Sequence, residues 1–115
     1  MAPVAAHPYM SIHPRHWRGW TKPEDADAYE ALLRETVLPH IREVEGHRGA
    51  YLLRNDGPAE SEFIVINFFE SLEAVKRFAG PEYHVAVFEP EARRLLSRIE
   101  PEAQHFDVRI APQPQ

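Results

Sequence analysis

The 115-residue chain contains no cysteine. Disulfide bonds, thiolate nucleophiles and cysteine-ligated zinc or iron-sulfur sites are therefore excluded. Any redox chemistry must come from the substrate, from a cofactor, or from a metal held by histidine and carboxylate side chains.

Positive charge is also scarce, because 13 lysines and arginines face 18 aspartates and glutamates and leave a net charge of -5. The basic residues are scattered, so neither nucleic acid nor an anionic membrane is expected as a partner. No apolar run approaches the ~20 residues of a membrane-spanning helix, and the first residues lack the pattern of a signal peptide. A cytoplasmic protein is the simplest expectation.

Glycine is infrequent, with five residues, whereas many of the 11 prolines lie near the two ends of the chain. Proline-rich ends are typically extended or frayed. The length fits one hydrophobic core. We expect an extended N-terminal arm at residues 1–10, a single domain at residues 11–110 and a flexible tail at residues 111–115.

The first half of the domain has clear strand and helix signals. An extended, aromatic stretch from Ser11 to Trp20 predicts a strand. Thr21 and Glu24 have the spacing of a capping box, and apolar residues then recur at helical spacing. Because proline lacks a backbone N–H, we expect this helix to kink or restart at Pro39.

A hairpin should follow the helix. Two β-branched and aromatic runs, residues 50–55 and 62–70, flank an Asp-Gly-Pro turn. Ser71 is placed to cap a short helix, and Gly80 to end it.

The last third of the domain is expected to hold one more helix and one more strand. Pro81 fits the first turn of a helix bent at Pro90, and residues 104–110 alternate as a strand with one buried face. The order strand, helix, strand, strand, helices, strand predicts an α+β, ferredoxin-like βαββαβ fold with the first strand in the centre of an antiparallel sheet. The sheet face without helices is too apolar for water, so a second copy of the chain is expected to cover it as a homodimer.

Several segments together resemble a known family. They are "WRGWT", "GHRGAYLLR", "FESLEAVKRFAGPEY", "PEARRLL" and "HFDV", they span Trp17 to Val108, and the run from Phe69 to Phe78 is the most specific. The chain is similar to the antibiotic biosynthesis monooxygenase-like proteins of the dimeric α/β-barrel superfamily. The resemblance implies the dimeric barrel fold. It also implies a range of activities: cofactor-independent quinone-forming monooxygenases, heme-degrading enzymes, and small-molecule isomerases and dehydratases.

Asn67 is the one polar residue in the apolar part of the second hairpin strand, and alternation places it on the face of Phe63, Val65 and Phe69. A buried amide needs hydrogen-bond partners. Two interpretations remain open: Asn67 bridges neighbouring structure, or its amide faces a substrate carbonyl or dioxygen.

His84 lies one helical turn before Phe88 in the predicted second helix, so its imidazole should point toward the apolar interior. Burial favours a neutral ring that can act as a base or as a heme ligand. Alignment with the heme-degrading relatives places their axial histidine on Phe88 and their pocket tryptophan on Phe78. His84 is therefore one turn away from the axial position, and a structural role for it also stays open.

His16 falls near the position at which the same relatives have a pocket asparagine, but a one-residue change of register would exchange it for Arg15 or Trp17. His13 and His16 point to opposite faces of a strand and cannot hold one ion together. A metal site would need further ligands such as His105, so none is expected.

Trp17, His105 and Asp107 form another polar group, on two strands predicted to be adjacent. His105 and Asp107 share a face, but side chains two residues apart on a strand stand too far apart for a direct hydrogen bond. A catalytic group and a polar cluster at an edge or dimer contact are both compatible with this pattern.

The leading hypothesis is a homodimeric small-molecule enzyme that resembles the cofactor-independent monooxygenases and acts on an aromatic or quinol-like substrate. We expect His84 to be the base, with Asn67 and His16 as its polar partners. The predicted substrate-binding residues are Trp17, Tyr83, Phe78, Phe88 and His105. The alternatives are a heme protein with His84 as the axial ligand and a ligand-binding dimer without turnover.

Overall fold

An antiparallel sheet organises the chain. A computed structural model describes residues 13–112, so the predicted arm at residues 1–10 and most of the predicted tail lie outside the described residues. The strand order is β2-β3-β1-β4, and β5 pairs with a separate part of β1. The strands are β1 (His13–Thr21), β2 (His47–Asp56), β3 (Ser61–Phe69), β4 (Leu96–Ile99) and β5 (Gln104–His105). The central place of the first strand is confirmed.

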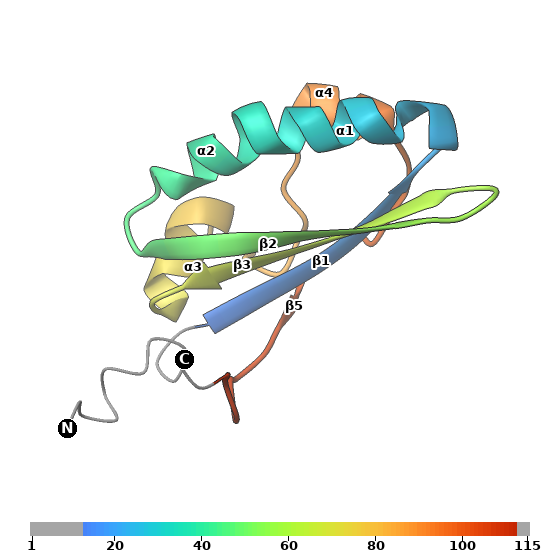
Figure 1. The fold of residues 1–115 in the computed structure, drawn as a ribbon. Coiled ribbons are helices and arrows are strands. Elements are labelled where there is room, and N and C mark those ends of the chain that lie inside the picture. Colours follow the sequence, from blue (N-terminus) through green and yellow to red (C-terminus); the bar gives the residue numbers. More distant parts are fainter. Residues whose placement is uncertain (1–12, 113–115) are drawn as a thin grey trace.

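The helices α1, α2 and α4 lie along one face of this sheet (Figure 1). The first helical run is continuous and consists of η3 (Pro23–Asp25), α1 (Ala26–Leu32), η4 (Leu33–Val37) and α2 (Leu38–Arg42). The second group is α3 (Leu72–Ala79) and α4 (Pro90–Leu95). The predicted α+β, ferredoxin-like architecture is confirmed. No helix in the described part of the chain is both long enough and apolar enough to cross a membrane.

Strict alternation along β3 separates the core from the opposite sheet face. Phe63 and Phe69 are fully buried, and Val65 is 7% exposed. Phe63 packs edge to face against Tyr29 of α1, with ring centroids 4.8 Å apart. Burying a large apolar side chain stabilises a fold by roughly 1.5–3 kcal/mol, so these contacts hold the first helix on the sheet.

The predicted hairpin and the cap of α3 are both present. β2 and β3 pair from His47 opposite Phe69 to Asp56 opposite Ser61. The Ser71 hydroxyl accepts a hydrogen bond from the Ala74 N–H at 3.1 Å. Gly80 ends α3 with a φ of 83°, a conformation that favours glycine.

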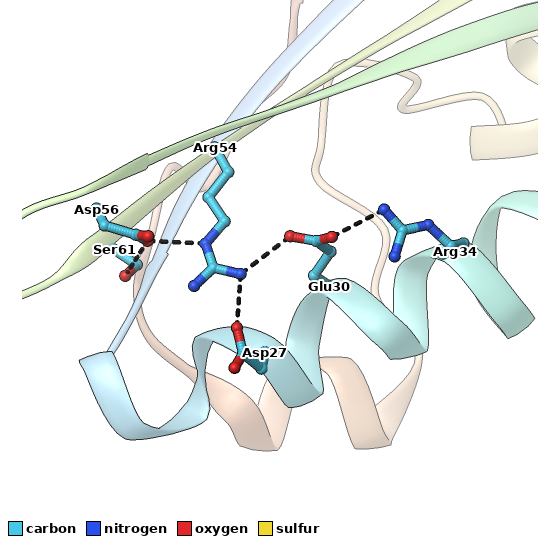
Figure 2. Close-up of polar contacts among 6 residues, drawn as sticks. All are labelled: Asp27, Glu30, Arg34, Arg54, Asp56 and Ser61. Carbon is cyan, nitrogen blue, oxygen red and sulfur yellow. Dashed lines mark hydrogen bonds and ion pairs between the residues drawn. The ribbon is translucent and has the colours of Figure 1, made fainter.

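Arg54 ties this hairpin to the first helix (Figure 2). Its Nη1 donates to Asp27 Oδ1 and Glu30 Oε1, both at 2.9 Å, and its Nε donates to Asp56 Oδ1 at 2.7 Å. Arg34 donates to the other oxygen of Glu30 at 2.8 Å. These carboxylates raise the pKa of Arg54, first through Asp56 and then through Glu30 and Asp27.

The predicted capping box at Thr21 is wrong. Thr21 is the last residue of β1, is fully buried, and pairs with Ser61 and Leu96 in the sheet. The helical run has Lys22 at its N-cap, without a side-chain cap, and begins with a 3-10 turn at Pro23. Sheet pairing on both sides of Thr21 therefore overrides the local helix signal.

The helix does not break at Pro39. A π-helical turn, η4, comes before it, and the Leu38 N–H donates to the Leu33 carbonyl five residues earlier. Pro39 then stands in the first turn of α2, where its missing N–H is tolerated. The wider turn absorbs the proline within one continuous helix.

The predicted helix from Pro81 is wrong as well. Residues 81–89 are irregular, helix appears only in α4, and Leu96–Ile99 is a strand. Long-range bonds take the backbone groups that a helix would need: the Ala103 N–H donates to the His84 carbonyl at 2.7 Å, and the Ala86 N–H donates to the Pro101 carbonyl at 3.0 Å. The predicted last strand at residues 104–110 is correspondingly reduced to the two residues of β5.

Candidate functional site

A cavity lies between the helix-side face of the sheet and the helices above it. Its floor comes from β1 and β3, one wall from the run α1–α2, and the rest from Phe78 of α3 and residues 87–92. The space open to the centres of water molecules is about 60 Å³. Its aromatic lining residues are Trp17, Tyr29, Phe78 and Phe88.

Two contacts hold the Trp17 ring, and a glycine leaves space for it. Its indole N–H donates to the Glu100 carbonyl at 2.7 Å, and its ring meets Phe88 edge to face at 5.3 Å. Gly19, two residues along the same strand face, leaves space for the ring, because a Cβ there would come within 2.2 Å of it. The predicted role of Trp17 and Phe88 as cavity residues fits this placement.

Asn67 is 5% exposed and lines the cavity floor. Its Oδ1 contacts Nε2 of His47 at 2.8 Å. An amide oxygen can only accept, so His47 must carry a proton on Nε2. The Asn67 Nδ2 group then points away from His47, and no residue in the described part of the chain accepts a hydrogen bond from it. Asn67 therefore bridges β3 to β2 through His47, while the interpretation that its amide faces a substrate stays a prediction.

Arg15 lies directly opposite Asn67 in the pairing of β1 with β3 and also lines the cavity. The side chain is only 4% exposed. Its Nη2 donates to the carbonyls of Tyr83 at 3.2 Å and Val85 at 2.9 Å, and its guanidinium lies 5.2 Å from the centre of the Phe78 ring. Its Nε is buried and has no hydrogen-bond partner among the residues that the structure describes.

The Arg15 cation also lacks a compensating anion. No carboxylate among residues 13–112 forms an ion pair with it, although Glu89 lines the same cavity. Burial alone lowers the pKa of Arg15 to about 10. The side chain therefore stays protonated at neutral pH as a buried, unpaired positive charge.

Tyr29 and Glu89 supply the remaining polar groups of the cavity. Burial raises the pKa of the Tyr29 hydroxyl, so the group remains protonated and can donate a hydrogen bond. Its hydroxyl has no partner within the described residues. Glu89 is half-buried and is the one carboxylate among the lining residues.

His84 and His16 do not lie in this cavity. His84 is exposed on the irregular segment, so the expectation of an imidazole on an inward helix face is wrong. His16 pairs with Ile66 on the opposite sheet face, where its ring meets Phe106 at 6.1 Å. The strand register is therefore shifted by one residue from the one that would place His16 in the cavity, and Arg15 and Trp17 face the helices instead.

Tyr83 and His105 lie next to Arg15 but outside the cavity lining. β5 places His105 opposite Arg15, and the rings of His105 and Tyr83 meet edge to face at 5.2 Å. Burial first, and then the Arg15 charge, lower the pKa of His105. Phe78, in contrast, lines the cavity, and its substrate-binding role stays a prediction. Asp107 is exposed, beyond the end of β5.

The cavity does not fit an axially ligated heme. None of the described residues that line it is a histidine, and His84 is exposed elsewhere. Within residues 13–112 there is also no group of three or more histidine, aspartate or glutamate side chains placed to hold a metal ion.

Sequence reasoning missed Arg15, Tyr29 and Glu89 as cavity residues. Arg15 was considered only as a register alternative to His16, and the polar Arg-His-Trp-Arg run gives no apolar alternation to fix the face. Gly19 was the available signal, because a glycine two residues from Trp17 on one strand face makes room for a large ring.

Comparison with known proteins identifies the family of this chain. The profile of the antibiotic biosynthesis monooxygenase family matches residues 17–90. No curated protein gives a match.

Solved structures with the same fold include a monooxygenase from the ActVA-Orf6 gene of Streptomyces coelicolor in complex with nanaomycin D (18% identity, TM-score 0.63, covering 98% of this chain and 100% of that chain). A protein of unknown function from Nitrosomonas europaea, NE2512, is 21% identical with a TM-score of 0.66, covering 93% of this chain and 98% of that one. Rv0793 from Mycobacterium tuberculosis is 19% identical with a TM-score of 0.57, covering 91% and 98%. Since the family profile matches more than half of the sequence, the chain belongs to the antibiotic biosynthesis monooxygenase family.

Proposed function

We propose that this protein is a monooxygenase-like enzyme that oxidises an aromatic or quinol-like small molecule without a cofactor of its own. The cavity carries the proposal, because aromatic rings line it while Asn67 presents an amide donor from its floor. The nanaomycin D bound to the Streptomyces coelicolor monooxygenase supports small-molecule binding in this fold.

The reaction class can be written for a phenol. Dioxygen accepts four electrons from the ring, one oxygen atom replaces a ring hydrogen, and the phenol becomes a quinone. The second oxygen atom leaves as water with the two hydrogens that the phenol loses. No external reductant is needed, because the substrate supplies all the electrons.

The cavity residues have different chemical roles in such a reaction. Glu89 is the group we assign to accept the phenolic proton, since it is the one carboxylate in the lining. The Asn67 amide donates to the oxygen on which negative charge develops, and His47 holds that amide in place. The aromatic walls exclude water from the reactive anion.

Oxygen consumption with a panel of phenols and quinols tests the function. We expect one dioxygen per quinone formed and no hydrogen peroxide. Glu89→Gln and Asn67→Ala should each lower kcat by about 10²–10³-fold, the usual size of a general-base or oxyanion contribution.

His84→Ala is the matched control, because that side chain is exposed away from the cavity. It should turn over normally. A loss of turnover in His84→Ala alone would restore the sequence-based assignment of the base. No oxygen consumption with any substrate in the panel would leave a ligand-binding protein without turnover.

We also propose a homodimer formed through the sheet face opposite the helices. Tyr51 and Leu53 of β2 are 53% and 45% exposed there, and they pair with Ile66 and Ile64 of β3. An apolar surface of this kind favours burial against a partner. Light scattering should give the mass of two chains, and Leu53→Glu should give a folded monomer; a wild-type monomer at micromolar concentration would contradict the dimer.

A further inference from the structure

We propose that Arg15 binds an anionic oxygen of the ligand, which makes the ligand of this cavity a single-ring aromatic acid, held as a carboxylate or an ionised phenol. The inference deepens the proposed function by naming the substrate class, and it rests on the same cavity being the ligand site.

The first argument is the charge of Arg15. A buried ion is strongly unfavourable unless an opposite charge and hydrogen bonds compensate it. Two backbone carbonyls and the Phe78 ring supply part of that compensation. No carboxylate within residues 13–112 supplies the rest, so an anion that enters the cavity meets an uncompensated cation.

The second argument is the free donor capacity at one place. The Nε of Arg15 is buried and unbonded, and the guanidinium can donate five hydrogen bonds in a planar fork. Asn67 stands directly across the strand pair, with its Nδ2 group turned away from His47. Cross-strand neighbours on one face have Cβ atoms about 4.5–5.5 Å apart, so both donors can reach a single oxygen-bearing group.

The third argument is the size of the cavity. The cavity offers about 60 Å³ of space to the centres of water molecules. An apolar cavity of about 150 Å³ accommodates benzene. The cavity is smaller than this, so it favours a ligand of no more than one ring, and the side chains of Trp17, Phe78 and Phe88 must move apart to admit that ring while its charged group meets Arg15.

Calorimetric titration with benzoate and its neutral isostere benzamide tests the carboxylate arm at pH 7 and low salt. Hydrogen bonds to charged groups contribute about 1.5–3 kcal/mol, so benzoate should bind the wild type about 10–100-fold more tightly than benzamide. Arg15→Met should abolish this preference and retain benzamide binding. Arg15→Lys keeps the charge without the planar fork and should retain a reduced preference.

Absorbance titration with 4-nitrophenol tests the phenol arm, because its anion absorbs visible light. Wild-type protein should increase the anionic fraction at a pH below the midpoint of the free phenol, and Arg15→Met should not. A preference for benzoate without an increase in 4-nitrophenol ionisation would identify a carboxylate as the bound group. Increased ionisation without a preference for benzoate would identify an ionised phenol.

Equal affinities of the wild type for benzoate and benzamide, together with no ionisation of 4-nitrophenol, would overturn the inference, as would a failure of both anions to bind. These wild-type comparisons decide the matter even if Arg15→Met fails to fold, which circular dichroism would reveal. Anion binding without oxygen consumption would support the role of Arg15 in binding and contradict the proposed oxygenase activity. Turnover with an unchanged KM in Arg15→Met would support the oxygenase activity and show that Arg15 does not bind the substrate.

Discussion

Arg15 and Arg54 occupy equivalent settings in one sheet but opposite electrostatic states. Both point toward the helices, and both guanidinium groups lie near a phenylalanine ring, Phe78 for Arg15 and Phe63 for Arg54. Arg54 meets three carboxylates near the surface (Figure 2). Arg15 is more deeply buried and forms no ion pair with a carboxylate of residues 13–112.

The difference separates structural from functional charge. Ion pairs with carboxylates of the helix and of its own hairpin hold the Arg54 side chain in place. Arg15 holds donors that the rest of the described chain leaves unused, although a buried apolar side chain would be better tolerated there. Perturbed, incompletely compensated groups in a cavity are typical of functional sites.

The largest expected effect comes from giving Arg15 the partner it lacks. Asn67→Asp places a carboxylate directly across the strand pair and should neutralise the guanidinium. We expect benzoate affinity to fall at least about 10-fold and by more than benzamide affinity, because both ligands lose the amide donor but only benzoate also loses a charged interaction. Calorimetry checks this, and undiminished benzoate binding would show that Arg15 is not the anion contact.

Next in size is the effect of removing the space beside Trp17. Gly19→Ala puts a methyl group where the indole ring lies, and overpacking of this kind costs about 1–3 kcal/mol of unfolding free energy. Urea unfolding measures the loss. The double variant Gly19→Ala/Trp17→Leu should recover much of it, whereas additive losses would place the conflict elsewhere.

Acid should destabilise the fold through two histidines with lowered pKa. Burial lowers the pKa of both His47 and His105, and the Arg15 charge lowers that of His105 further. The unfolded chain then binds more protons, so the stability that these groups contribute is complete above about pH 6.5 and is lost as the pH falls through their folded-state pKa values.

Titration by NMR sharpens the comparison of the two arginines. In Arg15→Met the pKa of His105 should rise, whereas that of His47 should hardly change. In Arg54→Met neither should move. An unchanged pKa of His105 in Arg15→Met would mean that the two groups do not interact.

The smallest effect is expected from Arg54→Met. Loss of its exposed ion pairs should lower the melting temperature only modestly, and the difference from the wild type should shrink as salt is added, because exposed charges are screened. A salt-independent loss would indicate packing against Phe63 as the main contribution of Arg54.

The fold could be predicted where sequence pattern and sheet agree. Alternation placed Phe63, Val65 and Asn67 on one face, and Ser71 and Gly80 marked the ends of α3. Prediction failed where distant pairing competed with local signals, as at Thr21 in the sheet and at His84, whose carbonyl is bonded to Ala103. Proximity in sequence carries no information about such bonds.

The site was predictable only in part for the same reason. Asn67 stands out as a polar residue within an apolar pattern, whereas Phe78 and Phe88 are predicted from the resemblance to the heme-degrading relatives. Arg15 was not, since its role depends on which face of β1 meets the helices, and a shift of one residue reverses that face.

The contact between His47 and Asn67 has a consequence for how the site responds to acidity. A neutral imidazole protonated on Nε2 and a doubly protonated imidazolium offer the same hydrogen to the amide oxygen. Asn67 can thus keep one orientation across the whole titration of its partner. A pH dependence of turnover would then have a source other than loss of the amide that faces the ligand.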